Sequence, residues 1–205
     1  RHGGVTIGAD NEINGFTLGG VGSATTVDHI EIVANQDDSI EIFGGTVNVT
    51  NILTYAQEDD ALDFDEAWSG SIKNALVIMG AGSDSAMELD GPAGSAATEA
   101  GYTIENVTLI GAGTSSKYAD LRDGLIANMK NVLAYGFTAD SKVKVNGDDS
   151  KAELANGRIT FSNWQVVLPS GVTVADLITG ANAADVTKFT ANVTAIASAS
   201  AATVG

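Results

Sequence analysis

The residues best placed to do chemistry are aspartates that occur in adjacent pairs. Residues 35–45 read NQDDSIEIFGG and residues 57–70 read QEDDALDFDEAWSG, so each pair stands just before an alternating apolar run and a glycine. Paired carboxylates can act as general acid and base, can bind a cation, or can cap turns in a repeating structure. The choice between these roles depends on where the fold places the pairs.

A calcium site is the first of these hypotheses. Calcium takes six to eight oxygen ligands, mainly carboxylates and carbonyls, and residues 59–66 alone carry four aspartates and one glutamate. The predicted ligands are Asp37, Asp38, Asp59, Asp60, Asp63 and Asp65. The alternative is a solvated acidic face whose aspartates cap backbone N–H groups.

The composition indicates a folded and strongly acidic domain. Of the 205 residues, 44% are hydrophobic and 18% are charged, which is typical of a chain with a packed core. The formal net charge of −16 makes nucleic acid a poor partner, because binding to phosphates depends on Lys and Arg. The chain has no apolar run of the ~18 residues that a membrane helix needs, so direct membrane insertion is not expected.

Cysteine is absent, and the sequence starts at Arg1 rather than at a methionine. A solenoid does not need disulfides, because its core is continuous from one repeat to the next. We interpret the chain as a piece of a longer, exported precursor and predict an extracellular or cell-surface location.

A six-residue pattern recurs along the chain: apolar, any, Asn, apolar, any, then apolar or small. It reads VTNILT at 49–54, IKNALV at 72–77, IENVTL at 104–109, MKNVLA at 129–134 and FSNWQV at 161–166, with VDHIEI at 27–32 as a variant. The anchor positions are His29, Asn51, Asn74, Asn106, Asn131 and Asn163. With loop-like insertions at 91–101 and 146–157 set aside, each unit has a length typical of one turn of a parallel β-helix.

The repeat predicts an all-β fold, a parallel β-helix (solenoid) of about six rungs over residues 1–171. Residues 172–205 lack the pattern, and we predict an irregular or weakly helical C-terminal cap or extension there. The Asn column is predicted to hydrogen-bond up and down the stack with its amides in the interior, so that Asn106 is buried. Stacking also predicts that Asp38 lies near Asp60 and Asp60 near Asp84, where like charges repel unless a cation or backbone N–H groups offset them.

The stretch NQDDSIEI resembles the N-x-D-D-x-x-x-I segment of the polygalacturonase family of β-helix glycoside hydrolases. The resemblance implies a catalytic role for Asp37 and Asp38, since glycoside hydrolysis uses two carboxylates. The family's Asn-Thr-Asp, Gly-His-Gly and Arg-Ile-Lys motifs are missing from this chain. A pectate lyase would need a basic residue beside calcium, and no arginine accompanies the acidic cluster in the sequence.

A longer resemblance covers residues 27–80. The strings DDSIEIFGGTVNV and EDDALDFDEAWSGSIKNALVI are similar to repeats of secreted, surface-associated β-helix proteins of Gram-negative bacteria, notably Bacteroidetes. This resemblance implies export and a right-handed β-helix, and it supplies no reaction.

Together these observations favour a non-enzymatic extracellular module with a structural or adhesive role, stabilised by calcium and able to self-associate or to bind other surface proteins. The alternative is a carbohydrate-active protein, either a polysaccharide-binding module or a polygalacturonase-like hydrolase with degenerate motifs. An enzyme or lectin would line one face with aromatic side chains, for which Tyr55, Trp68, Tyr135 and Phe137 are the candidates.

Overall fold

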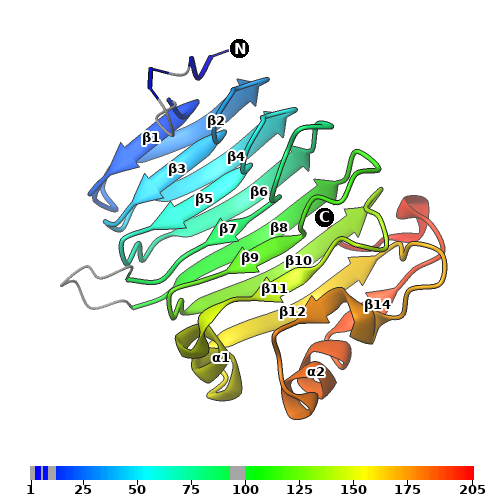
Figure 1. Cartoon of the computed structure of the whole chain (residues 1–205). Helices are drawn as coiled ribbons and strands as arrows, with labels where there is room; N and C mark the ends of the chain where they lie inside the picture. Colours follow the sequence, from blue (N-terminus) through cyan, green and yellow to red (C-terminus); the bar gives the residue numbers. More distant parts are fainter. Residues whose placement is uncertain (1–2, 6, 9–12, 93–99) are drawn as a thin grey trace.

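The protein is a parallel β-helix built from two seven-stranded sheets, as the repeat predicted. The computed structural model describes residues 3–5, 7–8, 13–92 and 100–205. Each turn contributes one strand to each sheet, the strand in the second sheet being the longer, although the last strand of that sheet, at the C-terminal end, has only 3 residues. Every described pairing is parallel. Figure 1 shows the turns following one another from the N-terminal to the C-terminal end.

The short strands form the first sheet: β1 (Phe16–Gly19), β3 (Ile40–Phe43), β5 (Leu62–Asp65), β7 (Glu88–Leu89), β9 (Ala119–Leu121), β11 (Val143–Val145) and β13 (Ile178–Thr179). The second sheet consists of β2 (Thr26–Val33), β4 (Asn48–Tyr55), β6 (Ser71–Ile78), β8 (Tyr102–Ile110), β10 (Ala127–Tyr135), β12 (Ile159–Val166) and β14 (Val193–Ala195). The helical segments are α1 (Gly147–Ala155), η1 (Val174–Leu177), α2 (Ala183–Thr190) and η2 (Ala199–Ala201).

The core runs between the two sheets as one continuous cluster of apolar side chains. In the first sheet the strand centres alternate, so Ile40 and Ile42 point inward while Glu41 points outward, and Leu62 and Phe64 flank Asp63 in the same way. Single rungs cannot bury their apolar face, and stacking them at about 4.8 Å does so.

The Asn column is a ladder of side-chain hydrogen bonds, but it lies on the outside of the solenoid. Nδ2 of each residue donates to Oδ1 of the one a rung earlier, at 2.9–3.1 Å, through Asn51, Asn74, Asn106, Asn131 and Asn163. At the N-terminal end of the ladder, Asn51 Nδ2 donates to Asp28 Oδ1 rather than to the neighbouring His29. The side chains are exposed or half-buried, so the predictions of interior amides and of a buried Asn106 were wrong.

The left-handed backbone of the ladder residues explains their outward orientation. Their φ angles lie between 55° and 62°, a conformation that asparagine tolerates better than most residues. This conformation bends each long strand and interrupts the alternation, so that in β4 both Thr50 and Asn51 face outward, between the buried Val49 and Ile52. The bend lets one strand wrap two sides of the core.

The segments expected to lack the repeat are more regular than the pattern suggested. The insertion at 146–157 forms α1, whose helix formers and first-turn aspartates favour a helix over the loop expected there. Most of the insertion at 91–101 lies outside the described residues. Residues 172–205 add β13 to the first sheet and β14 to the second, with α2 beside them at the C-terminal end (Figure 1). No helix among the described residues is long and apolar enough to span a membrane.

Candidate functional site

The paired aspartates lie in the turns that lead into β3 and β5, where their carboxylates hold the following rung. Asp38 Oδ1 accepts a hydrogen bond from the backbone N–H of Asp60 at 3.0 Å, and Asp60 Oδ1 accepts one from the N–H of Ser85 at 2.5 Å. Both side chains are buried. The capping role considered from the sequence is therefore confirmed for these two residues.

A column of acidic residues runs across the outer face of the first sheet. Strand register aligns Glu41 with Asp63, Asp63 with Glu88, and Glu88 with Asp120. Lys144 follows in the same column on β11. These are the outward residues at the centres of successive short strands, and tight packing of neighbouring rungs buries Glu41, Asp63 and Asp120 although they point away from the core.

In the later rungs, basic side chains neutralise these carboxylates. Lys144 Nζ lies 3.3 Å and Lys117 Nζ 3.6 Å from Asp120 Oδ2. Lys117 Nζ also lies 2.5 Å from Oδ2 of Asp84, in the turn before β7. Arg122 pairs with Glu88 and contacts Asp90, with Nε 3.4 Å from Oδ1. The earlier rungs differ, because residues 2–72 contain no lysine or arginine.

Three buried carboxylates of the early rungs lie close together. Oxygens of Asp38, Glu41 and Asp63 all lie within 4.8 Å of one another. Among the described residues, Asp63 Oδ1 is buried without a hydrogen-bond partner, and Asp63 is 7% exposed. A buried carboxylate that lacks both a donor and a counter-charge is costly, so this site calls for a proton or a cation.

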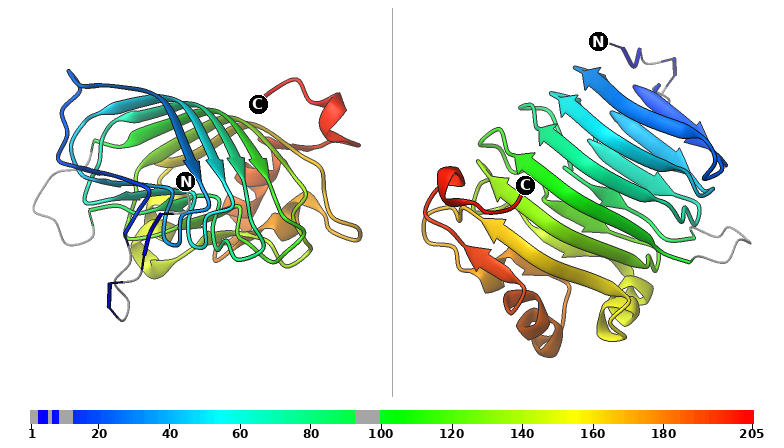
Figure 2. Two further views of the ribbon diagram at one scale, coloured as in Figure 1. Left: turned by 90° about the horizontal axis from the view of Figure 1, so that it is seen from above. Right: turned by 180° about the vertical axis from the view of Figure 1, so that it is seen from behind.

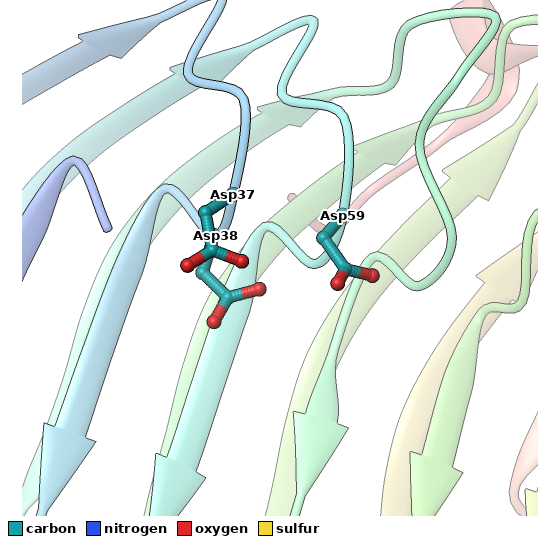
Figure 3. Close-up of side chains that lie close together, drawn as sticks. All are labelled: Asp37, Asp38 and Asp59. Carbon is teal, nitrogen blue, oxygen red and sulfur yellow. The ribbon is translucent and has the colours of Figure 1, made fainter. Parts of the chain in front are cut away.

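Two further groups flank this triad. Asp37, Asp38 and Asp59 form one of them, with their side chains arranged along neighbouring turns in Figure 3. Asp59, Asp60 and Asp84 form the other, again with oxygens within 4.8 Å. The stacking had predicted that Asp60 lies near Asp84, and this is confirmed. The backbone oxygen of Asp59 also accepts the N–H of Asp84, at 3.1 Å.

Burial changes the proton affinity of the triad. It raises the pKa of Glu41 to about 7, and the charges of Asp65 and Asp37 add to the effect. It also raises the pKa of Asp63 far above its ordinary value, with further contributions from Asp38 and Asp65. The pKa of Asp38 moves in the same direction for the same main reason, although the hydrogen bond from the N–H of Asp60 opposes it.

The triad fits a hard divalent cation, the class of ion that the sequence suggested. Carboxylate oxygens from two adjacent strands and one turn would supply three ligands, and calcium completes its shell with carbonyl oxygens and water. Five of the six residues predicted as ligands belong to one of the three acidic groups. Asp65 belongs to none of these groups and lies near Asp90 instead. Burial raises the pKa of Asp90, and the charge of Asp65 raises it further.

Glu41 and Asp84 are the group members that were not predicted as ligands. The signal for Glu41 was present in the sequence, because IEIF and LDFD place their second residues on the same face of the sheet. Pairing these two tetrapeptides in register brings Glu41 and Asp63 together.

Comparison with known proteins agrees with this architecture. The whole chain, residues 1–205, matches the family described as a pectate-lyase-like β-helix domain. The chain belongs to this family. No curated protein and no solved structure matches it. Membership supports the parallel β-helix that both resemblances implied, while the narrower group of Bacteroidetes surface proteins stays a prediction.

In this pectate-lyase-like domain, an arginine does share the acidic face, contrary to the impression from the sequence. The guanidinium group of Arg122 contacts the carboxylates of both Glu88 and Asp90 on the outer face of the first sheet. These two residues follow Asp63 and Asp65 in the strand register.

The aromatic residues proposed for a sugar-binding face do not gather on one. Trp68 and Phe137 are buried in the core, where Trp68 packs against Phe64 with ring centroids 4.6 Å apart. Tyr55 is exposed and Tyr135 is half-buried. Family membership fits both an extracellular β-helix module and a carbohydrate-active protein, and the distribution of aromatic residues favours the first.

Proposed function

We propose that this domain is a non-enzymatic extracellular β-helix module with a structural or adhesive role, whose early rungs are stabilised by calcium held between Asp38, Glu41 and Asp63. The observation that carries the proposal is the buried Asp63 Oδ1, which has no hydrogen-bond partner in the described part of the chain and has two further buried carboxylates beside it.

The contrast between early and late rungs supports a cation. Where the column carries Glu88 and Asp120, Arg122 and Lys144 supply positive charge. Where it carries Glu41 and Asp63, no basic side chain is paired with them among the described residues. A divalent ion supplies there what lysine and arginine supply further along the solenoid.

The burial of these carboxylates supports a structural rather than a catalytic role. Asp38, Glu41 and Asp63 are each more than nine-tenths buried, so a polysaccharide chain has little access to their oxygens. Arg122 is already paired with Glu88 and Asp90, and these contacts hold its guanidinium group within the protein.

The second candidate function is a carbohydrate-active protein. It is favoured by the family itself and by the presence of acidic residues, Arg122 and Lys144 on one sheet face. Partners would then include acidic polysaccharides, whereas the structural module would bind other surface proteins or further copies of itself.

Thermal unfolding at pH 8 with calcium or with excess EDTA tests the cation. At a hundredfold excess over Kd, a ligand bound only by the folded state adds about 2.7 kcal/mol, which corresponds to a rise in Tm of roughly 5–10 °C for a domain of this size. Asp63→Asn should abolish the rise. With EDTA, Asp63→Asn should unfold at a higher temperature than the wild type, because a buried asparagine needs neither a proton nor a cation to be neutral. Asp140→Asn, at an exposed site, is the matched control and should respond like the wild type.

The same samples separate the two functions. Light scattering with and without calcium reports self-association, and incubation with polygalacturonate reports chain cleavage through new reducing ends or unsaturated products. Absence of a calcium response in the wild type would refute the cation site. Cleavage that is lost in Asp38→Asn would refute the non-enzymatic role and establish the second candidate.

A further inference from the structure

A groove of about 600 Å³ lies on the outer face of the second sheet, beside the Asn ladder. Side chains of β4, β6 and β8 form it, among them Asn51, Leu53, Asn74, Leu76 and Thr108, and Gly205 lies at one end. None of the described residues that line it is charged, although the chain carries a formal charge of −16. The groove is thus an uncharged strip on a strongly acidic protein.

The chain's own tail already occupies the neighbouring part of this face. Residues 196–205 return to the outside of the second sheet (Figure 2). Gln165 on β12 binds Thr203 twice: its Nε2 donates to Thr203 Oγ1 at 2.7 Å, and its Oε1 accepts the backbone N–H at 2.9 Å. A side-chain amide on this face therefore recognises the backbone of an extended segment.

Gly205 continues the same path across the strands. A Cβ built on it would lie 2.6 Å from Thr108 Oγ1 on β8 and 2.9 Å from Leu133 Cβ on β10, so the tail lies directly on these side chains. Between Thr203 and Gly205 the tail passes from β12 towards β8, and the groove extends that path over β8, β6 and β4.

The ladder amides that border the groove have unused hydrogen-bonding capacity. Asn74 Nδ2 donates to Asn51 Oδ1, and Asn106 Nδ2 donates to Asn74 Oδ1, each at 3.1 Å. Since an amide has two N–H donors and two lone pairs on oxygen, a ladder residue such as Asn74 keeps one donor and one acceptor without a partner among the described residues. Leu53 and Leu76 add an apolar surface beside them.

We propose that this groove binds an extended peptide segment of small, uncharged residues, lying across β4, β6 and β8 in line with the chain's own tail. The ladder amides would bond to its backbone as Gln165 does to Thr203, and the leucines would contact its side chains. Three stacked strands span about 10 Å at ~4.8 Å per rung, which three residues at ~3.3 Å each would cover. This inference does not depend on the calcium site.

Nuclear magnetic resonance of the intact, ¹⁵N-labelled chain tests the proposal directly. The probe is a synthetic peptide with the sequence of residues 197–205, ASASAATVG, blocked at both ends and titrated to millimolar concentration. We expect saturable shifts of the side-chain amide signals of Asn51, Asn74 and Asn106. Leu76→Asp and, separately, Leu53→Asp should abolish these shifts. Thr160→Asp, outside the groove on the same outer face, should bind the peptide like the wild type.

Three results would overturn the proposal. One is the absence of any saturable shift in the wild type. Another is a change confined to Gln165, which would mean that the peptide only displaces the tail from its existing position. The third is that cellotetraose shifts the ladder amides while the peptide does not, which would assign the groove to a neutral glycan.

Discussion

The buried triad should make the free energy of unfolding depend on pH, and the pKa of Glu41 gives the size of this effect. Burial raises the pKa of Glu41 from its ordinary value of 4.5 to about 7. Between pH 4.5 and about pH 7, Glu41 has lost its proton in the unfolded chain but keeps it in the folded chain. The folded state then binds more protons, so the free energy of unfolding falls as pH rises through this window.

The size of the effect follows from the window. One such group changes the free energy of unfolding by about 1.4 kcal/mol per pH unit, so Glu41 alone accounts for a loss of roughly 3 kcal/mol between pH 4.5 and 7. For a domain of this size, that loss corresponds to a fall in Tm of roughly 6–12 °C. Asp38 and Asp63, whose pKa values burial also raises, continue the loss above pH 7.

The assay is urea unfolding followed by circular dichroism in EDTA, at half-unit steps from pH 4.5 to 8. Glu41→Gln should remove much of the slope below pH 7, because glutamine cannot ionise. Glu58→Gln, at an exposed position in the turn before β5, is the control and should leave the slope unchanged. A wild-type free energy of unfolding that is flat or rises between pH 5 and 7 would refute the assignment of buried, proton-holding carboxylates.

Three further predictions concern the ladder, the core and the ion pairs. Asn74→Ala should lower the free energy of unfolding by about 2 kcal/mol, because alanine is strained in the left-handed backbone and loses the ladder hydrogen bonds. Asn74→Gly should lower it less, because glycine adopts this conformation without strain. Equal losses for the two variants in urea unfolding would contradict the backbone contribution. Trp68→Ala should cost roughly 3–5 kcal/mol, because the side chain is fully buried and its Nε1 donates to the carbonyl of Val47; a cost under about 1 kcal/mol would contradict the packing. Arg122→Ala should leave Asp90 buried without its counter-charge. The free energy of unfolding should then fall by about 3 kcal/mol at pH 8 and by less at pH 5. An equal loss at pH 8 and pH 5 would show that Arg122 contributes packing rather than charge.

The sequence was sufficient for the architecture because the repeat records the stacking directly. Each Asn of the column occupies the same place in its rung, and the hydrogen bond from Asn74 to Asn51 is the contact that this spacing predicted. What the spacing did not reveal was the side on which the column lies. That depends on the left-handed φ of each Asn, which interrupts the alternation in the middle of a strand.

The candidate site was only partly predictable, because it is formed between rungs. Asp38 and Asp63 were identified from their acidic surroundings, whereas Glu41 looked like an ordinary outward residue of an alternating strand. Its burial arises from the neighbouring strand 22 residues later in the chain. The proximity of Asp60 and Asp84, by contrast, followed from the stacking of successive turns and is confirmed.

The uneven placement of basic residues along the rungs gives the solenoid an axial dipole. Residues 1–72 contain 13 acidic residues and one basic residue, a formal charge of −12, while residues 73–205 contain 13 acidic and nine basic residues, a formal charge of −4. The N-terminal end is therefore the negative pole. At physiological ionic strength its field reaches about 8 Å, far enough to raise the local concentration of cations around the rungs whose carboxylates lack lysine and arginine. When two copies meet at low salt, contact between their two less charged C-terminal ends is the least repulsive, so the charge pattern itself disfavours any encounter that brings an N-terminal pole into the contact.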